Sequence, residues 1–224
     1  MQYTQSNIDN IISAVEKFYD EVHPTLGYDL YGNKLDGGII RGNTEQFVEN
    51  VLQIIFDKIN ELYSLNIQSI VGGKKKVKRI INYNNTEVID EVQVDRHVIY
   101  NEKFKFFIEN KTYLDKCFMD RAYNDFRRII RCLKQDNSTN LNDVRFFIFA
   151  GQTCVANDSA IMLESDFMED MTNLCPDVNP IALKPIPIFF LKGKRSHHKA
   201  LYKHKYELDK DALTTFLKMI IDSL

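Results

Sequence analysis

The sequence predicts an α/β protein with a mixed central β-sheet flanked by helices. Two observations support this prediction: short strand-like segments follow one another through the middle of the chain, and helical segments stand before, within and after them. With 224 residues, of which 44% are hydrophobic, the chain can bury one good core. We therefore expect a single domain over residues 1–224.

The helical predictions are led by residues 44–63, whose apolar stripe runs from Phe47 to Leu62. Thr44 or Asn43 is a good N-cap there, and Glu45 places an acid in the first turn. The turn-rich stretch before this segment predicts a loop. The other predicted helices are residues 5–20, 113–133, 157–173 and 210–223. The apolar faces of the first and last helix are expected to be core first and a dimer interface second.

The predicted strands form two hairpins and several single segments. The turn Asn84-Asn85-Thr86 joins residues 77–83 to 88–94, and Asn101-Glu102-Lys103 joins residues 95–100 to 104–110. Single strands are expected at 67–71, 145–150 and 186–191. Pro187 places the last of them at a sheet edge or a strand start.

Composition excludes several classes of protein. The four cysteines have no CxxC spacing, which argues against a zinc site or a disulfide framework. The first residues lack the basic and apolar regions of a secretory signal, and no apolar run is long enough for a membrane helix. These features predict a cytoplasmic protein without membrane contact. Because the net charge is −2, nucleic-acid binding would require segregation of basic residues.

The strand that ends near residue 111 carries the candidate catalytic side chains. Strand alternation places Glu109 and Lys111 on one side, while Phe104, Phe106 and Ile108 point to the core on the other. Asp95 begins the partner strand of the hairpin, so its carboxylate is expected beside that of Glu109. The alternative interpretation of Glu109 and Lys111 is a surface ion pair at a strand end.

Two neighbouring carboxylates and an amine suit metal-assisted phosphodiester hydrolysis. Mg²⁺ is usually bound by one or two carboxylates together with a substrate phosphate oxygen. Such an ion polarises the phosphate and lowers the pKa of a bound water. A nearby Lys111 can orient that water and offset charge on the phosphate. We therefore predict Asp95 and Glu109 as Mg²⁺ ligands, with Asp90 as the alternative to Asp95.

A third carboxylate is expected from the helix at 44–63. Glu45 borders the buried stripe, from where it can face a metal site across the sheet. Its place in the first turn is also explained by the helix dipole alone. Glu49, one turn further along, is the alternative.

The order of these residues resembles the PD-(D/E)XK nuclease superfamily, most closely its type II restriction endonucleases. Residues 41–48 (RGNTEQFV) resemble the Gly-x-x-x-Glu helix start of many members, and Glu109-Asn110-Lys111 matches the second half of the motif. Val94-Asp95 stands where the family has Pro-Asp, so the proline is missing. The resemblance implies a restriction-endonuclease-like fold with a catalytic core at 41–150. It also implies that the Asn110 carbonyl helps to hold Mg²⁺ and that Lys111 assists the attacking water.

Three basic tracts are candidates for DNA contact. The first is predicted to be a mobile arm with Lys74, Lys75, Lys76, Lys78 and Arg79. The second is the arginine-bearing helix at 113–133. The third is a loop at 192–205 with Lys194, Arg195, His197, His198 and Lys199. Together they predict a segregated basic face. Gln152 and Asn157 are candidates for base reading.

These inferences lead to one hypothesis and two alternatives. The hypothesis is a bacterial Mg²⁺-dependent, sequence-specific endonuclease that cuts double-stranded DNA. Cutting both strands needs two active sites, so a homodimer on a palindromic site is expected. The alternatives are a structure-selective or repair nuclease of the same fold, and a non-enzymatic DNA-binding or regulatory protein.

Overall fold

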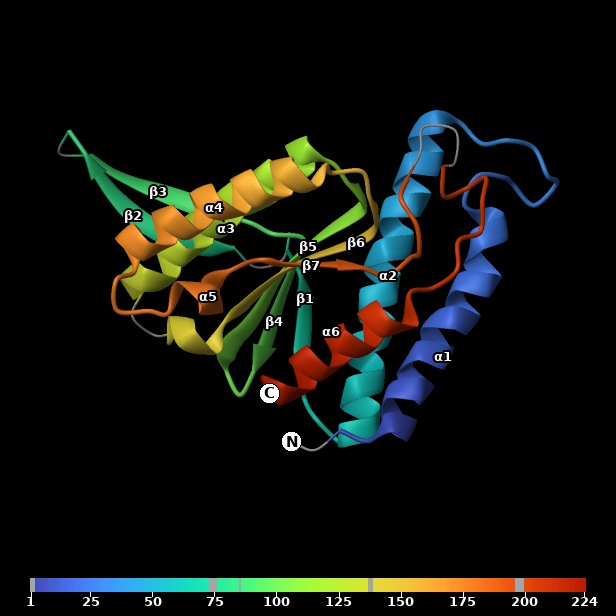
Figure 1. Cartoon of the computed structure of the whole chain (residues 1–224), viewed down its shortest axis with the longest axis horizontal. Helices are drawn as coiled ribbons and strands as arrows, with labels where there is room; N and C mark the ends of the chain where they lie inside the picture. The colour runs from blue at the N-terminus through green and yellow to red at the C-terminus, as the bar shows by residue number, and fades with distance from the viewer. Residues whose placement is uncertain (1–2, 73–75, 85, 137–138, 196–199) are drawn as a thin grey trace.

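A computed structural model describes residues 3–72, 76–84, 86–136, 139–195 and 200–224 of the chain. Its centre is a mixed five-stranded sheet with helices on both faces, which confirms the predicted α/β class (Figure 1). The strand order is β1–β4–β5–β6–β7. The strands are β1 (Gln68–Val71), β4 (Arg96–Tyr100), β5 (Lys103–Leu114), β6 (Arg145–Thr153) and β7 (Ile186–Phe189).

The sheet is antiparallel on one side of β5 and parallel on the other. β1 pairs with β4 and β4 with β5 in antiparallel register, whereas β6 runs parallel to β5 and β7 parallel to β6. Parallel neighbours need a crossover, and helices supply it between β5 and β6 and between β6 and β7. As predicted from Pro187, β7 is an edge strand.

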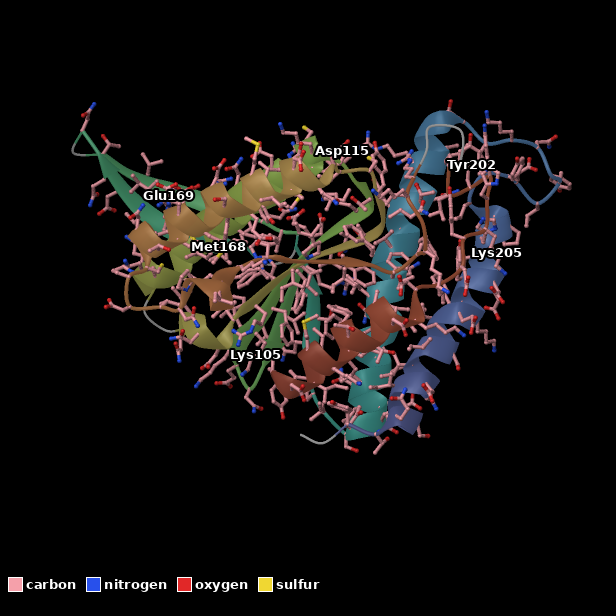
Figure 2. All side chains as sticks on the ribbon, viewed as in Figure 1. Lys105, Asp115, Met168, Glu169, Tyr202 and Lys205 are labelled. Atoms are coloured by element: carbon pink, nitrogen blue, oxygen red, sulfur yellow. The ribbon has the colours of Figure 1, made fainter. Side chains whose placement is uncertain are left out.

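Two helical layers cover the sheet (Figure 1). One face carries α1 (Gln5–Val22), α2 (Gly37–Tyr63) and α6 (Lys210–Asp222). The other carries α3 (Lys116–Asp136), α4 (Asn157–Leu174) and the short α5 (Pro180–Leu183). Side chains fill the space between these layers (Figure 2).

The alternation of apolar residues along the strands produces two separate cores. Phe106 and Phe147 belong to the core beneath α1, α2 and α6, whereas their neighbours Phe107 and Phe146 belong to the core beneath α3 and α4. The apolar faces of α1 and α6 are buried, so they are core, as the first interpretation expected. Among the described residues, no helix is both long enough and apolar enough to cross a membrane.

The predicted start of the second helix was wrong. α2 begins at Gly37, because the side chain of Asp36 accepts a hydrogen bond from the Gly38 N–H and caps the helix. Thr44 lies inside the helix, where its hydroxyl donates to the carbonyls of Ile40 and Arg41. Glu45 therefore does not lie in the first turn.

A β-bulge corrects the predicted faces of β5. Val98 pairs with Phe106 but Ile99 pairs with Phe104, so β5 has one extra residue at this point. Phe104 consequently packs on the same side as Phe107, not with Phe106. β5 also extends to Leu114, so residues 113 and 114, predicted to start a helix, belong to the strand.

Residues 77–79 of the predicted mobile arm belong to a strand. β2 (Val77–Tyr83) pairs with β3 (Thr86–Val92) in a hairpin that projects from the body (Figure 1). The side-chain amide of Gln135 in α3 bonds both backbone groups of Ile80 and fastens the hairpin edge. Lys74 and Lys75 lie outside the described residues.

The described basic residues of this hairpin are paired within the protein. Lys76 and Lys78 both contact Glu91, at 2.7 and 2.8 Å. Asp90 receives Arg79 at 2.9 Å and Arg128 of α3 at 2.6 Å. The hydrogen bond from Arg128 lowers the pKa of the Asp90 carboxyl against the opposing effect of burial, and Arg79 adds to that lowering.

Asp90→Asn should lower the free energy of unfolding at neutral pH by about 1–2 kcal/mol, because the ionised carboxylate is stabilised by both arginines. A folded-state pKa below the unfolded value gives stability that is present at higher pH and is lost as the pH falls through the folded value. The difference between the two proteins should therefore shrink below about pH 4. Urea denaturation across pH measures it, with exposed Glu87→Gln on the same strand as the control. A difference that is constant with pH would contradict the ion-pair account.

Candidate active site

A pocket of about 500 Å³ opens at the end of the sheet where β5 terminates. It is lined by the first turns of α2, the end of β5, the start of α3, and by Leu191, Arg195 and residues 200–202. Of the four residues predicted to be catalytic, Asp95, Lys111 and Glu45 lie on its wall, and Glu109 does not. The pocket is therefore where the chain gathers its candidate chemistry.

Asp95, Glu109 and Lys111 come together as one partly buried cluster. The Lys111 ammonium donates to Asp95 Oδ2 at 3.0 Å and to Glu109 Oε2 at 2.8 Å. The Asn110 backbone N–H donates to the same Asp95 oxygen at 2.8 Å. Glu109 is 5% exposed, and the side chain of Lys111 is 18% exposed. The two carboxylates thus share one cation on the same side of the sheet.

Burial and mutual repulsion dominate the electrostatics of this cluster. Burial, and then the charge of Asp95, raise the pKa of Glu109 above its ordinary value, and Lys111 offsets this only in part. Burial alone would lower the pKa of Lys111, but Glu109 and Asp95 outweigh it and raise that pKa. A second cation placed between the carboxylates would relieve their repulsion.

Backbone contacts set the position of Asp95, which lies in the bend before β4 and does not begin the strand as predicted. The Gly72 N–H donates to the Asp95 carbonyl at 2.8 Å. The two segments cross so closely that a Cβ on Gly72 would lie 1.6 Å from the Val94 carbonyl oxygen. Only glycine leaves room for this crossing.

A buried arginine joins this bend to α2. Arg96 is 2% exposed, and its guanidinium donates to Gln53 Oε1 at 2.8 Å, to Ser69 Oγ at 2.7 Å and to the Glu49 carbonyl at 3.2 Å. Asp95 and the middle of α2 are therefore held at a set separation.

Of the two acids proposed on α2, Glu49 has the closer electrostatic relation to Asp95. Burial, and then the charge of Asp95, raise the pKa of Glu49, while Arg96 lowers it. Glu45 also lines the pocket, but its carboxylate binds Arg41 at 2.8 Å and is largely exposed. The alternative metal ligand Asp90 is held by Arg79 and Arg128 instead.

Sequence reasoning missed Asp125 of α3. Burial raises the pKa of its carboxyl, opposed by Arg128, Arg121 and Lys111, and the charge of Asp95 acts in the same direction as burial. Asp125 borders the buried stripe of α3, which is the signal that drew attention to Glu45.

Asn110 presents an unusual side chain. Its Nδ2 and Oδ1 atoms are buried, and neither has a hydrogen-bond partner among the described residues. An unpaired buried amide costs stability and calls for an explanation. Because Asn110 also lines the pocket, a bound water or ligand group would supply the missing partners.

The predicted DNA-contacting residues lie in different environments. The Gln152 amide donates to the carbonyls of Lys192 and Gly193, at 2.9 and 3.3 Å, and so holds the following loop. Asn157 is exposed at the start of α4. Lys194 is also exposed, whereas Arg195 lines the pocket. His197, His198 and Lys199 lie outside the described residues.

Several charges of the basic tracts are paired with acids within the protein. Lys192 pairs with Glu207 and Lys205 with Asp20, both at 2.6 Å. In α3, Arg127 pairs with Asp170 at 2.6 Å. Much of the positive charge that the sequence displays in runs is thus neutralised by partners distant in sequence.

The donors fit a hard divalent cation that is completed by its substrate. Within the described ranges, no group of three or more His, Cys, Asp or Glu side chains is close enough to enclose a metal ion. Mg²⁺, however, is commonly bound by only one or two carboxylates with water and phosphate oxygens. Asp95 and Glu109 supply such a pair, and the open pocket leaves space for the remaining ligands.

Comparison with known proteins adds no relative. The chain matches no protein-family model, and it matches no curated protein. The structure shows an α/β protein with a mixed sheet. Its function is proposed below from the geometry of the pocket.

Gly72→Ala should lower the free energy of unfolding by about 1–3 kcal/mol, because the new Cβ must push the Val94 carbonyl away. Gly42→Ala in α2 is the matched control, since a Cβ there has no neighbour within 4 Å. That variant should gain up to about 1 kcal/mol from improved helix propensity. Urea denaturation measures both. Equal effects of the two substitutions would contradict the importance of the close crossing.

Proposed function

We propose that this protein is a Mg²⁺-dependent endonuclease that hydrolyses phosphodiester bonds of double-stranded DNA. The observation that carries the proposal is a pair of carboxylates, the half-buried Asp95 and the buried Glu109, joined by the ammonium of Lys111, with Asp95 and Lys111 lining the pocket. This is the residue set of the PD-(D/E)XK motif that the sequence resembles. An α/β mixed sheet with the motif at its end is compatible with that resemblance.

Each residue of the cluster has a distinct role in the proposed reaction. Asp95 and Glu109 would hold Mg²⁺, which when bound would polarise the scissile phosphate and lower the pKa of a coordinated water. Relieved of part of its ion pairing, Lys111 would orient the attacking water and stabilise negative charge developing on phosphate. Asn110 would hold its backbone bond to Asp95 and offer its amide to an ordered water.

The finer proposal is a type II restriction enzyme. A chain with one such cluster cuts one strand, so cleavage of both strands at one place calls for two copies arranged around a palindromic site. Under this proposal, the protein works as a homodimer on a defined DNA sequence. A structure-selective or repair nuclease would use the same cluster on a different DNA substrate.

One observation favours a non-enzymatic alternative. Lys111 already forms ion pairs with both carboxylates, as it would in a purely structural ion cluster. In that case the protein would bind DNA or regulate another factor without requiring Mg²⁺. Metal dependence separates the two possibilities.

Purified protein should cut plasmid DNA in Mg²⁺ and leave it intact in excess chelator. Discrete bands and a single end sequence would support the restriction-enzyme proposal, whereas selective cleavage of branched DNA would favour a structure-selective nuclease. Gel analysis and end-sequencing provide both readouts. Absence of cleavage of any of these substrates in Mg²⁺ would remove the enzymatic proposal.

Asp95→Ala and Lys111→Ala should each abolish cleavage while DNA binding survives, because they remove a metal ligand and the amine beside the attacking water. Asp90→Asn is the matched control: it alters a carboxylate close in sequence that is bound to arginines away from the cluster. Folding of each variant is checked by circular dichroism. Full activity of a folded Asp95→Ala or Lys111→Ala protein would refute the mechanism.

Glu49→Gln should reduce the cleavage rate more than Glu45→Gln. Glu49 interacts directly with the charge of Asp95, whereas Glu45 is exposed and paired with Arg41. We expect a loss of at least about tenfold for Glu49→Gln, comparable to the effect of supporting residues around metal sites. Single-turnover rates measure the comparison. The reverse order would assign the helical carboxylate to Glu45.

A further inference from the structure

Arg195 lies at the pocket and has no carboxylate partner among the described residues. Its guanidinium lies over the Tyr113 ring, 3.5 Å from the ring centroid, and it lines the pocket. Among the described residues, no acid forms an ion pair with it, in contrast to Lys192 and Lys205 of the same tract. The guanidinium therefore retains its donors for an external anion.

The backbone around Arg195 is tethered to the end of β6. The Arg195 N–H donates to the Thr153 carbonyl at 3.3 Å, and Lys194 forms a parallel bridge with Thr153. The Gln152 side-chain amide donates hydrogen bonds to the carbonyls of Lys192 and Gly193. Tyr113 is itself buttressed by Phe118, whose ring meets it edge-on at 5.6 Å. A guanidinium held in this way loses little conformational freedom when it binds an anion.

The position of Tyr113 relates Arg195 to the carboxylate cluster. Glu109, Lys111 and Tyr113 alternate along β5 and therefore share one face. Residues two apart on a strand are about 7 Å apart, a spacing comparable to that of successive phosphates in one DNA strand. An extended strand of nucleic acid lying along β5 would thus meet the cluster and the guanidinium in succession.

We propose that Arg195, stacked on Tyr113, binds the DNA phosphate adjacent to the one that faces Asp95 and Glu109. This inference rests on the proposed function and identifies Arg195 as the residue that positions the DNA backbone. Arg121 of α3 lines the same pocket, forms no ion pair among the residues described, and would assist from the other wall. A contact of this kind positions the strand and carries no sequence information.

The test measures binding to a fluorescently labelled short DNA duplex of random sequence, in chelator, over a series of salt concentrations. Arg195→Ala should weaken binding about tenfold and reduce the slope of log affinity against log salt by about one. Arg195→Lys should recover the slope but not the full affinity, because the charge is kept and the planar fork is lost. Tyr113→Leu should weaken binding with the slope nearly unchanged.

Lys205→Ala is the matched control. Lys205 belongs to the same basic tract but lies beside α1, paired with Asp20 (Figure 2). Its removal should leave both affinity and slope unchanged. A second arm uses inorganic phosphate as the probe, which should compete with DNA only weakly if a continuous strand is the ligand.

The outcomes separate this proposal from the proposed function. Because the assay contains no Mg²⁺, a protein that binds DNA through Arg195 but never cuts it would keep this inference and lose the nuclease. If the wild type cleaves DNA and Arg195→Ala leaves affinity and slope unchanged, the nuclease proposal is kept and the assignment of Arg195 is lost. Failure of the wild type to bind the duplex, or tight Arg195-dependent binding of inorganic phosphate without DNA binding, would overturn the assignment.

Discussion

The organisation of the pocket depends on one buried ammonium shared by two carboxylates. Taking Asp95, Glu109 and Lys111 out of water is costly unless each charge is compensated. Lys111 compensates both acids at once, at 3.0 and 2.8 Å. With all three groups ionised, the cluster would carry one more negative than positive charge, and burial, followed by the charge of Asp95, raises the pKa of Glu109. A cation bound between the carboxylates, as proposed, would favour their charged forms.

Contacts of the surrounding structure hold this cluster in place. Gly72 lets the end of β1 cross against the Val94–Asp95 bend, and the Asn110 N–H binds the Asp95 carboxylate from β5. Arg96 fastens the same bend to α2. Strand, bend and helix are therefore connected around the pocket, and a side chain from any one of them can be aimed accurately at the others.

Part of this arrangement could be anticipated from local pattern. Strand alternation placed Glu109 and Lys111 on one face, and the hairpin brought Asp95 beside them, as predicted. Other features were out of reach. The cap at Asp36 lengthened α2 by two turns, and the bulge between Val98 and Ile99 moved Phe104 to the opposite face. A bulge depends on how two strands fit together, so neither strand displays it alone.

By itself, the sequence determined the class of fold, the identity of most helices and strands, and the Glu-x-Lys motif on a strand, because periodicity and turn chemistry are local properties. Tertiary structure alone decided which charges are available. It paired Asp90 with Arg79 and Arg128, Lys205 with Asp20, and left Arg195 on an aromatic ring. Whether a charged side chain finds a partner depends on residues remote in the chain, and burial then sets how strongly the pair interacts. Runs of lysine and arginine could not reveal that outcome.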